Sequence, residues 1–330
     1  MKSIKNILII YFIFTFLLTS ILFSNETTTK KPIILEVQWF PQAQFAGYIM
    51  AFEKGFFEAE GLDVKIKFSD GEDSPIECVL EGEVDFCTAW LSQAITMKSE
   101  GKPLVNICQI FQKTTLMLIT KKKSGILTPQ DMNGKRVGYW GGDFSIQAKA
   151  FLRKFKIKAD LIPQSFSIDA FLAEAVDVTS AMFYNEYHKI IQSGIDEDEM
   201  LPFFFSDYEL NFPEDGIYCT ENTYNSNPEL CKTMREAIIS GWEYAFSHQE
   251  ETLDKIMEYC RDFHLQTNKA HQRWMLWAVI TAITYQVGEE SSNWGILKKN
   301  DFLQVADELK EQDFIKKIPD YENFYKGVSP

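Results

Sequence analysis

Short apolar runs alternate with helical patterns along the chain after residue 32, and this alternation limits the fold more than any other feature. Gly and Pro residues mark the transitions. The first predicted strands cover residues 33–39, 62–68, 84–87, 104–111 and 116–120. Helices are predicted between them at residues 45–57, 74–81 and 91–98. Strands that alternate with helices in this way predict an α/β fold with a largely parallel sheet.

The same pattern then begins a second time. A glycine-rich turn and a helix from residue 145 to about 154 follow a short strand, and the strands of this part are predicted at 137–139, 160–163, 178–183 and 201–205. Two similar units in one chain predict two lobes. After residue 227 the pattern is mostly helical, with apolar residues at i, i+3 and i+4 spacing. We expect these helices, at residues 228–246, 250–263, 269–285 and 301–311, to complete the first lobe.

The N-terminus predicts export. Lys2 and Lys5 precede an uncharged run at residues 7–24, and polar residues follow at once. This order is typical of a secretory signal peptide, here residues 1–24, with a linker at 25–32. An uncleaved membrane anchor is the alternative, because the run is close to the length that spans a bilayer. In either case we expect the remaining chain in the periplasm or at the extracellular face of the membrane.

Charge and cysteine content narrow the classes of partner. The chain has 33 Lys and Arg against 47 Asp and Glu, a formal net charge of -14 that argues against nucleic acid as a partner. No C-x-x-C pair is present, so neither a zinc knuckle nor any other metal site is predicted. Export would permit disulfides, and the alternative is that cysteines in apolar segments are small buried hydrophobic residues. The six cysteines are Cys78, Cys87, Cys108, Cys219, Cys231 and Cys260, of which the first three lie in apolar segments.

Five segments carry a resemblance to a known family. They are VQWFPQAQFAGYIMAFEKGFFEAEGLDV (37–64), GEVDFCTAW (82–90), GKPLVNICQIFQ (101–112), LTPQDMNGKRVGYWGGDF (127–144) and NFPEDGIY (211–218). In order and spacing, the chain resembles the NMT1/THI5-like group of periplasmic binding proteins over about residues 33–290. The resemblance implies an α/β, two-lobed periplasmic binding protein fold of type II, with a ligand cleft between the lobes.

The resemblance also implies where the lobes lie and what they bind. Lobe 1 would comprise residues 33–120 and 217–330, and lobe 2 residues 121–216. The crossings between the lobes would lie near 118–124 and 212–219. Members of the group include receptors that deliver the pyrimidine precursor of thiamine to an ABC permease. Other relatives bind different small nitrogen heterocycles or serve as sensor domains.

The same group contains an enzyme, the thiamine pyrimidine synthase, which consumes its own histidine and a pyridoxal phosphate held on a lysine. Aligned on GEVDFCTAWLSQA, the positions of that lysine and histidine hold Ala89 and Gln93. Without an amine no Schiff base forms, and an amide does not supply an imidazole. We therefore expect a binding protein with no catalytic residue and no cofactor.

Residues that follow the first and third strands are candidates for ligand contact, because open α/β sheets bind ligands beyond the carboxyl ends of their strands. Trp39 ends the first strand, and Trp90 follows the third. A flat heterocycle can stack on such rings while amide groups contact its ring nitrogens. The alternative is that the rings fill the core of the lobe. The candidates here are Trp39, Gln42, Gln44, Phe45, Trp90 and Ser92.

Tyr184, Asn185 and Glu186 follow the strand at 178–183 and are the leading polar candidates. An aminopyrimidine presents an N–H donor beside a ring-nitrogen acceptor, and a carboxyl with an amide matches that edge. The alternative is a helix N-terminus in which Asn185 caps the helix and Glu186 occupies its first turn.

Two further positions complete the predicted site. The turn Gly141-Gly142-Asp143 can present backbone N–H groups to an anion, but the Asp143 carboxylate would repel phosphate, which favours a neutral or cationic ligand. Asp215 lies in the segment expected to carry the return crossing, where it either contacts ligand or orders the hinge.

Together these observations predict the extracytoplasmic binding protein of an ABC importer, with a permease and an ATPase as partners. Its predicted ligand is a small nitrogen heterocycle, the hydroxymethylpyrimidine or formylaminopyrimidine precursor of thiamine. A ligand-sensing module that acts through a separate signalling partner is the main alternative. An enzyme similar to the thiamine pyrimidine synthase is the less favoured one.

Overall fold

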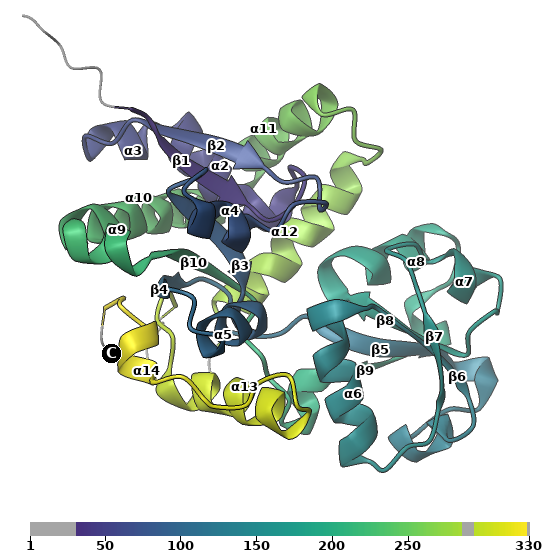
Figure 1. The fold of residues 1–330 in the computed structure, drawn as a ribbon. Coiled ribbons are helices and arrows are strands. Elements are labelled where there is room, and N and C mark those ends of the chain that lie inside the picture. The colour runs from purple at the N-terminus through teal and green to yellow at the C-terminus, as the bar shows by residue number, and fades with distance from the viewer. Residues whose placement is uncertain (1–30, 286–293, 329–330) are drawn as a thin grey trace, which may run out of the picture. The chain divides into compact units, whose positions relative to one another are not determined.

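Two five-stranded sheets form the framework of the molecule (Figure 1). The structure, a computed structural model, describes residues 31–285 and 294–328, and every element below belongs to the unit Ile33–Pro330. The first sheet has the order β2 (Val64–Phe68), β1 (Ile33–Val37), β3 (Phe86–Trp90), β10 (Asp215–Thr220) and β4 (Leu104–Gln109). Strand β1 is parallel to both neighbours, whereas β10 is antiparallel to both of its neighbours.

The second sheet repeats this plan. Its order is β7 (Asp160–Pro163), β6 (Arg136–Tyr139), β8 (Val178–Met182), β5 (Leu116–Lys121) and β9 (Met200–Phe204). Strand β6 is parallel to both neighbours, and β5 is antiparallel to both of its own. The predicted α/β class is confirmed, and each sheet is mixed because one strand arrives from the other sheet.

The crossings between the sheets lie earlier in the chain than predicted. Strand β5 pairs only with strands of the second sheet, so the outward crossing lies between β4 and β5, at residues 110–115, and not near 118–124. The return crossing lies between β9 and β10 and ends at Asp215. An apolar run such as 116–120 predicts a strand without indicating which sheet it joins. The division into two separately moving lobes stays a prediction.

Helices cover both sheets, and several of them begin with a side-chain cap. Around the first sheet lie α2 (Ala46–Glu53), α3 (Phe56–Ala59), α4 (Pro75–Glu81), α5 (Leu91–Ser99), α9 (Glu221–Ser226), α10 (Pro228–Ser247), α11 (Gln249–Asp262), α13 (Lys299–Glu311) and α14 (Tyr321–Phe324). The second sheet carries α6 (Ser145–Lys154), α7 (Asp169–Leu172) and α8 (His188–Gln192). Ser74, Asn227 and Asn268 accept backbone N–H groups at the starts of α4, α10 and α12 (Lys269–Ile283).

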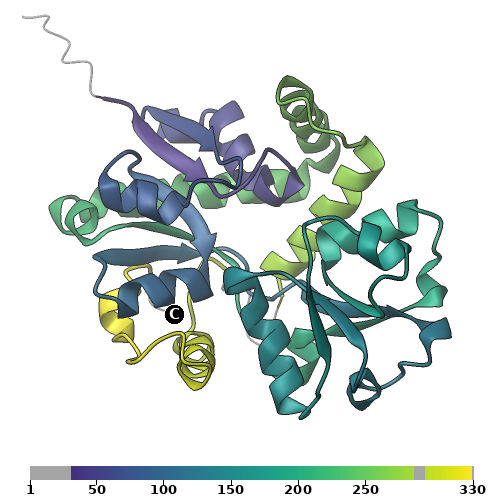
Figure 2. The same cartoon turned by 45° about the vertical axis from the view of Figure 1, so that its right-hand side comes forward.

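Helix α12 departs from the expectation that the C-terminal helices only complete the first lobe. It packs against the 3-10 turn η1 (Ala43–Phe45) beside the first sheet and against η5 (Phe183–Tyr187) beside the second. Figure 2 shows this light-green helix reaching the teal elements of the second sheet. None of the helices in residues 31–285 and 294–328 combines the length and the apolar character that a membrane crossing requires.

All six cysteines are buried free thiols. The interpretation of Cys78, Cys87 and Cys108 as small buried hydrophobic residues is confirmed. The sulfur atoms of Cys219 on β10 and Cys231 on α10 lie 3.8 Å apart.

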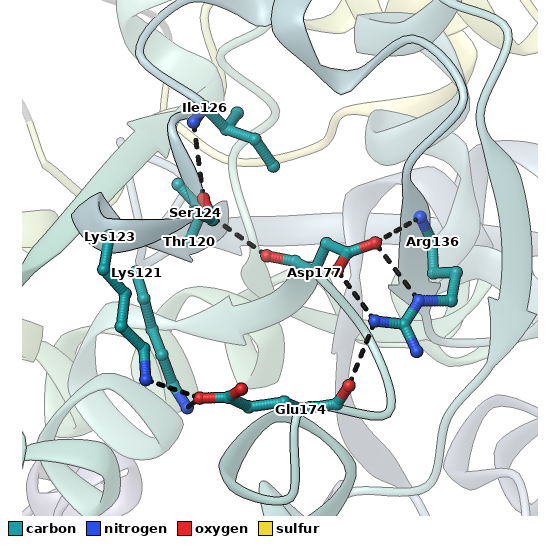
Figure 3. A network of polar contacts seen from close by, with 8 residues as sticks. All are labelled: Thr120, Lys121, Lys123, Ser124, Ile126, Arg136, Glu174 and Asp177. Carbon is teal, nitrogen blue, oxygen red and sulfur yellow. Dashed lines mark hydrogen bonds and ion pairs between the residues drawn. The ribbon is translucent and has the colours of Figure 1, made fainter.

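A polar network joins the starts of β6 and β8 to the end of β5 (Figure 3). The Arg136 guanidinium donates to the Asp177 carboxylate through Nε at 3.2 Å and through a terminal nitrogen at 2.8 Å, and its backbone N–H donates at 2.9 Å. Lys121 and Lys123 both contact the Glu174 carboxylate. Hydrogen bonds from Arg136 hold the pKa of Asp177 below its usual range. The network therefore fixes the edge of the second sheet at which these strands begin.

We expect Asp177→Ala to lower the melting temperature at neutral pH by a few degrees, because the guanidinium fork and the backbone N–H of Arg136 lose their shared acceptor. Lys123→Ala, at an exposed end of the network, should change it much less. Because the folded pKa of Asp177 is depressed, its stabilisation is present above the ordinary value of 3.8 and is lost as the pH falls below it. Thermal melts at pH 7 and pH 3 check this, and a difference that is as large at pH 3 as at pH 7 would contradict the charge-based explanation.

Candidate functional site

A cavity of about 540 Å³ lies where the strands of both sheets end at their carboxyl ends. Residues after β1, β2 and β3 line it from the first sheet, and residues after β6, β7 and β8 line it from the second. The side chains that line it are mainly aromatic rings, amides and carboxylates. This combination suits a flat ligand with polar edges.

Five aromatic rings from both sheets meet at the cavity. Trp39 packs edge-on against Phe166, with ring centroids 5.2 Å apart, and Trp90 packs edge-on against Phe144 at 4.5 Å. Trp140 contacts both phenylalanines, at 6.0 and 5.8 Å. Two pairs therefore join rings of the first sheet to rings of the second.

Gly71 allows Trp39 to take its position. A Cβ at residue 71 would lie 2.2 Å from the Trp39 ring, and the backbone there has a φ of +85°. Glycine therefore meets a steric and a conformational requirement at once. The loop after β2 is held against the ring in this way, and it brings Glu72 and Asp73 to the cavity.

A buried carboxylate orients the amides of the cavity wall. Asp215, fully buried at the start of β10, accepts hydrogen bonds from the Nε2 groups of Gln38 and Gln44. Gln42 in turn donates to Gln44 Oε1 at 2.6 Å. Burial raises the pKa of Asp215 to about 7. Asp215 itself does not line the cavity, so its position supports the prediction of an ordering role.

The preceding residue, Glu214, joins the two crossings. Its carboxyl accepts hydrogen bonds from the hydroxyl groups of Thr114 and Thr115, at 3.1 and 3.0 Å, and from the Thr115 backbone. Asn211 adds two contacts, accepting from Thr114 N–H at 2.9 Å and donating to Gln112 O at 3.0 Å. Burial raises the pKa of Glu214 to about 8. The outward and return crossings are thus bonded to each other at the point where any hinge must lie.

Glu186 lies in a single π-helical turn, η5, that follows β8. Its side chain is buried with 3% of its surface exposed, and it accepts from Met182 N–H at 3.0 Å and from Asn185 Nδ2 at 2.6 Å. Burial raises its pKa. Turns of this type occur frequently at functional sites. The carboxylate accepts hydrogen bonds from its own helical turn and still lines the cavity. A place in the first turn of a helix and a place at the ligand site are therefore compatible for Glu186.

Helix α12 supports this wall from behind. Asn185 Oδ1 lies 3.1 Å from His271 Nε2, and His271 Nδ1 lies 2.9 Å from His188 Nδ1. Trp274 donates from Nε1 to the Phe183 carbonyl at 2.9 Å and stacks on His188. Burial lowers the pKa of His271 to about 4. Asn185 therefore hydrogen-bonds to Glu186 on one side of its amide and lies against His271 on the other, which positions the Glu186 carboxyl and leaves one N–H of Asn185 Nδ2.

Most of the residues predicted from the sequence meet at this cavity. Those that line it are Trp39, Gln42, Gln44, Trp90, Gly141, Gly142, Tyr184, Asn185 and Glu186. Phe45 and Ser92 do not, and the structure corrects their placement. Each is almost fully buried within η1 or α5, where the helical rotation turns the side chain into the core. The side chain of Asp143 lies outside the described residues.

The two positions aligned with the synthase residues differ in exposure. Ala89 is buried within β3, whereas Gln93 lines the cavity. In residues 31–285 and 294–328, no group of three or more His, Cys, Asp or Glu side chains is placed to hold a metal ion.

Several lining residues were not predicted. They are Gln38, Gly71, Glu72, Asp73, Ser74, Pro75, Gln93, Trp140, Phe144, Gln164, Phe166 and Met182. The strand-end rule that identified Trp39 applies equally to Trp140, which directly follows β6. No local signal marks Phe166, an aromatic residue in the loop after β7 that is half exposed at the cavity.

Comparison with known families gives a match over most of the chain. A family model described as NMT1/THI5 like matches residues 42–252. The chain is similar to the riboflavin-binding protein of Chloroflexus aurantiacus, with 21% identity over 73% of this chain and 70% of the relative. It is also similar to the formylaminopyrimidine-binding protein of Halalkalibacterium halodurans, with 21% identity over 71% and 72%. Proteins named as hydroxymethylpyrimidine phosphate synthases match shorter stretches, 41% to 51% of the chain.

A solved structure confirms the predicted fold. The periplasmic aliphatic sulphonate-binding protein of Escherichia coli superimposes with a TM-score of 0.69 and 15% identity, over 91% of this chain and 94% of that protein. The likeness establishes the two-lobed α/β fold of periplasmic binding proteins. Together the comparisons place the chain with binding proteins and not with the synthases.

The buried acid pair predicts that stability decreases as the pH rises. Glu214 and Asp215 have ordinary pKa values of 4.5 and 3.8, against about 8 and about 7 in the fold. The folded protein thus binds more protons than the unfolded chain between these limits, and the free energy of unfolding falls from about pH 4 to about pH 8. Between these pH values the free energy of unfolding should fall by about 2 to 4 kcal/mol more in the parent than in Glu214→Gln. Denaturant titrations across the range check it, and parallel pH profiles would contradict it.

Proposed function

The chain belongs to the NMT1/THI5-like family, and from this we propose that it is the extracytoplasmic receptor of an ABC importer for a small nitrogen heterocycle. The observation that carries the proposal is the cavity, in which aromatic rings from both sheets surround a buried carboxylate, Glu186. Such a site binds and orients a flat molecule. Gln93 and Ala89 at the positions of the synthase residues support transport over catalysis.

The proposed ligand is the hydroxymethylpyrimidine or formylaminopyrimidine precursor of thiamine. Trp39 and Trp90 supply faces on which a pyrimidine can stack. The Glu186 carboxylate keeps lone pairs for an exocyclic amine beyond its two internal hydrogen bonds. The name of the Halalkalibacterium relative, a formylaminopyrimidine-binding protein, supports this choice.

Export and the partners follow from the same proposal. Residues 1–24 carry the predicted signal peptide and lie outside the described residues. In this proposal the receptor acts in the periplasm or at the extracellular face of the membrane and hands its ligand to a permease driven by an ATPase. Isothermal titration of the exported protein with the two pyrimidines and with riboflavin tests it. Binding of either pyrimidine supports the proposal, and binding of riboflavin alone would replace its ligand.

We expect Glu186→Gln to weaken pyrimidine binding by about 10- to 150-fold, because a charged hydrogen bond in a desolvated site contributes roughly 1.5 to 3 kcal/mol. The glutamine Oε1 can still accept from Met182 N–H, which preserves the π-helical turn. Glu58→Gln, an exposed first-turn change on α3, is the matched control. Titrations of both variants, each with a melting temperature near the parent, decide the matter. An unchanged affinity for Glu186→Gln would leave the carboxylate with a structural role alone.

We also expect the two lobes to close on the ligand by rotation about the bonded crossings at 110–115 and 205–214. A ligand that stacks on Trp39 and contacts Glu186 bridges both sheets and therefore favours the closed form. Small-angle scattering with and without saturating pyrimidine should show a smaller radius of gyration in the complex. Identical profiles would contradict the closure, while binding measured on the same samples would leave the receptor function intact.

A further inference from the structure

The charged groups around the cavity are of one sign. Among the described residues that line it, Glu72, Asp73 and Glu186 are acids, and none is Lys, Arg or His. Asp215 adds a carboxyl directly behind the wall, in contact with the Gln38 amide. An anionic group in this cavity would meet carboxylates with no cation among the lining side chains, which is unfavourable in a partly desolvated space. The Lys189 ammonium acts on Glu186 only from outside the lining residues, where it opposes the effect of burial on the pKa of that carboxyl.

The amides of the wall add to the same polarity. The Asp215 carboxyl accepts hydrogen bonds from the Nε2 groups of Gln38 and Gln44, and Gln44 Oε1 accepts one from Gln42 Nε2. No described residue donates to Oε1 of Gln38 or of Gln42, so these two oxygens remain as acceptors for a ligand. The wall therefore offers two free acceptor oxygens, while each of the three amide nitrogens keeps only one N–H for a ligand.

Four backbone donors at the rim are also occupied by protein acceptors. The N–H groups of Gln38, Gly71, Glu72 and Met182 donate to side-chain oxygens of Thr88, Ser69, Asp70 and Glu186, at 2.9 to 3.0 Å. Helix α4, which begins at the cavity, has Pro75 at its first position, where no N–H exists. These amides do not form an anion-binding cradle.

The aromatic rings complete the pattern. Trp39, Trp90 and Trp140, with Phe144 and Phe166, surround the cavity from both sheets. The electron-rich faces of such rings attract organic cations, and tryptophan attracts them most strongly. Rings and carboxylates together are the means by which proteins bind cationic ligands.

We propose that the cavity takes its ligand as an aromatic cation and excludes phosphorylated, sulfonated and carboxylated compounds. The proposal rests on the proposed function in treating this cavity as the ligand site, and it deepens that function by assigning the charge of the ligand. A 4-aminopyrimidine becomes an aromatic cation when one of its ring nitrogens binds a proton, and in this proposal it does so beside the Glu186 carboxylate. The sulphonate-binding neighbour thus shares the fold, but its named ligand has the charge that this cavity rejects.

Three ligands that share one ring system and differ in charge test the proposal by isothermal titration at pH 8. They are 1-methylquinolinium, 4-methylquinoline and quinoline-4-carboxylate. The cation should bind about 3- to 30-fold more tightly than the neutral compound, the range expected for cation–π attraction, and the anion should bind more weakly than both. Added salt should weaken binding of the cation more than binding of the neutral compound.

Variants identify the source of the preference. In the triple variant Glu72→Gln, Asp73→Asn, Glu186→Gln, the ratio of cation to neutral affinity should fall at least threefold, whatever the change in each affinity alone. Glu77→Gln on α4, an exposed acid outside the cavity, is the matched control and should keep the parental ratio. Gln93→Lys places an amine in the cavity and should reverse the order of cation and anion.

The results separate this inference from the proposed function. A parent protein that binds the carboxylate as tightly as the cation, or that binds no cation, overturns the charge assignment. A triple variant that keeps the full preference does so as well. Pyrimidine precursors that fail to bind, together with the expected order of the quinolines, overturn only the proposed ligand. A variant enters the comparison only if its melting temperature is close to that of the parent, so that a loss of folding is not mistaken for an effect of charge.

Discussion

Two adjacent carboxyl groups, buried where the chain returns to the first sheet, organise both the crossings and the cavity wall. Neighbouring residues of an extended segment point in opposite directions. Glu214 is directed to Thr114 and Thr115 on the outward crossing, and Asp215 to Gln38 and Gln44 of the first sheet. Burying a carboxyl is unfavourable unless hydrogen bonds compensate it, and here hydroxyl and amide donors do so without a cation. One dipeptide therefore links the two crossings to the wall of the cavity.

The strand-end rule predicted about half of the cavity because the fold presents strand ends at a single place. Trp39 and Tyr184 follow a strand and Trp90 ends one, and the structure brings all three to the cavity. The rule did not predict correctly which residues line the cavity once the chain had entered the helix that follows the strand. Phe45 and Ser92 lie within η1 and α5, where rotation about the helix axis turns their side chains into the core.

The remainder of the site depends on contacts between distant segments, which a local pattern does not encode. Phe166 reaches Trp39 only because the loop after β7 lies beside the loop after β1. Strand β10 was not predicted, because its sequence after Pro213 was interpreted as a hinge, and only its pairing with β3 and β4 identifies it as a strand. The sheet that β5 joins is likewise a property of pairing and not of its apolar run. The sequence therefore predicted most of the elements and the resemblance predicted their arrangement, whereas strand β10 and the correct positions of the crossings required the structure.

The second sheet separates its charges along the strands. Its cations gather where the strands begin: Arg136 opens β6 and pairs with Asp177, while Lys121 and Lys123 pair with Glu174 at the end of the antiparallel β5. A strand of four residues such as β6 spans roughly 13 Å, so this basic edge lies well outside direct contact with the cavity. Each of these cations is also held by an acid. The carboxyl ends of β6 and β8 consequently offer rings, amides and Glu186 to the cavity without a cation among the lining side chains. The negative character of the site is thus a property of how the sheet distributes charge, and the excess of acids in the whole chain adds only its screened, long-range part.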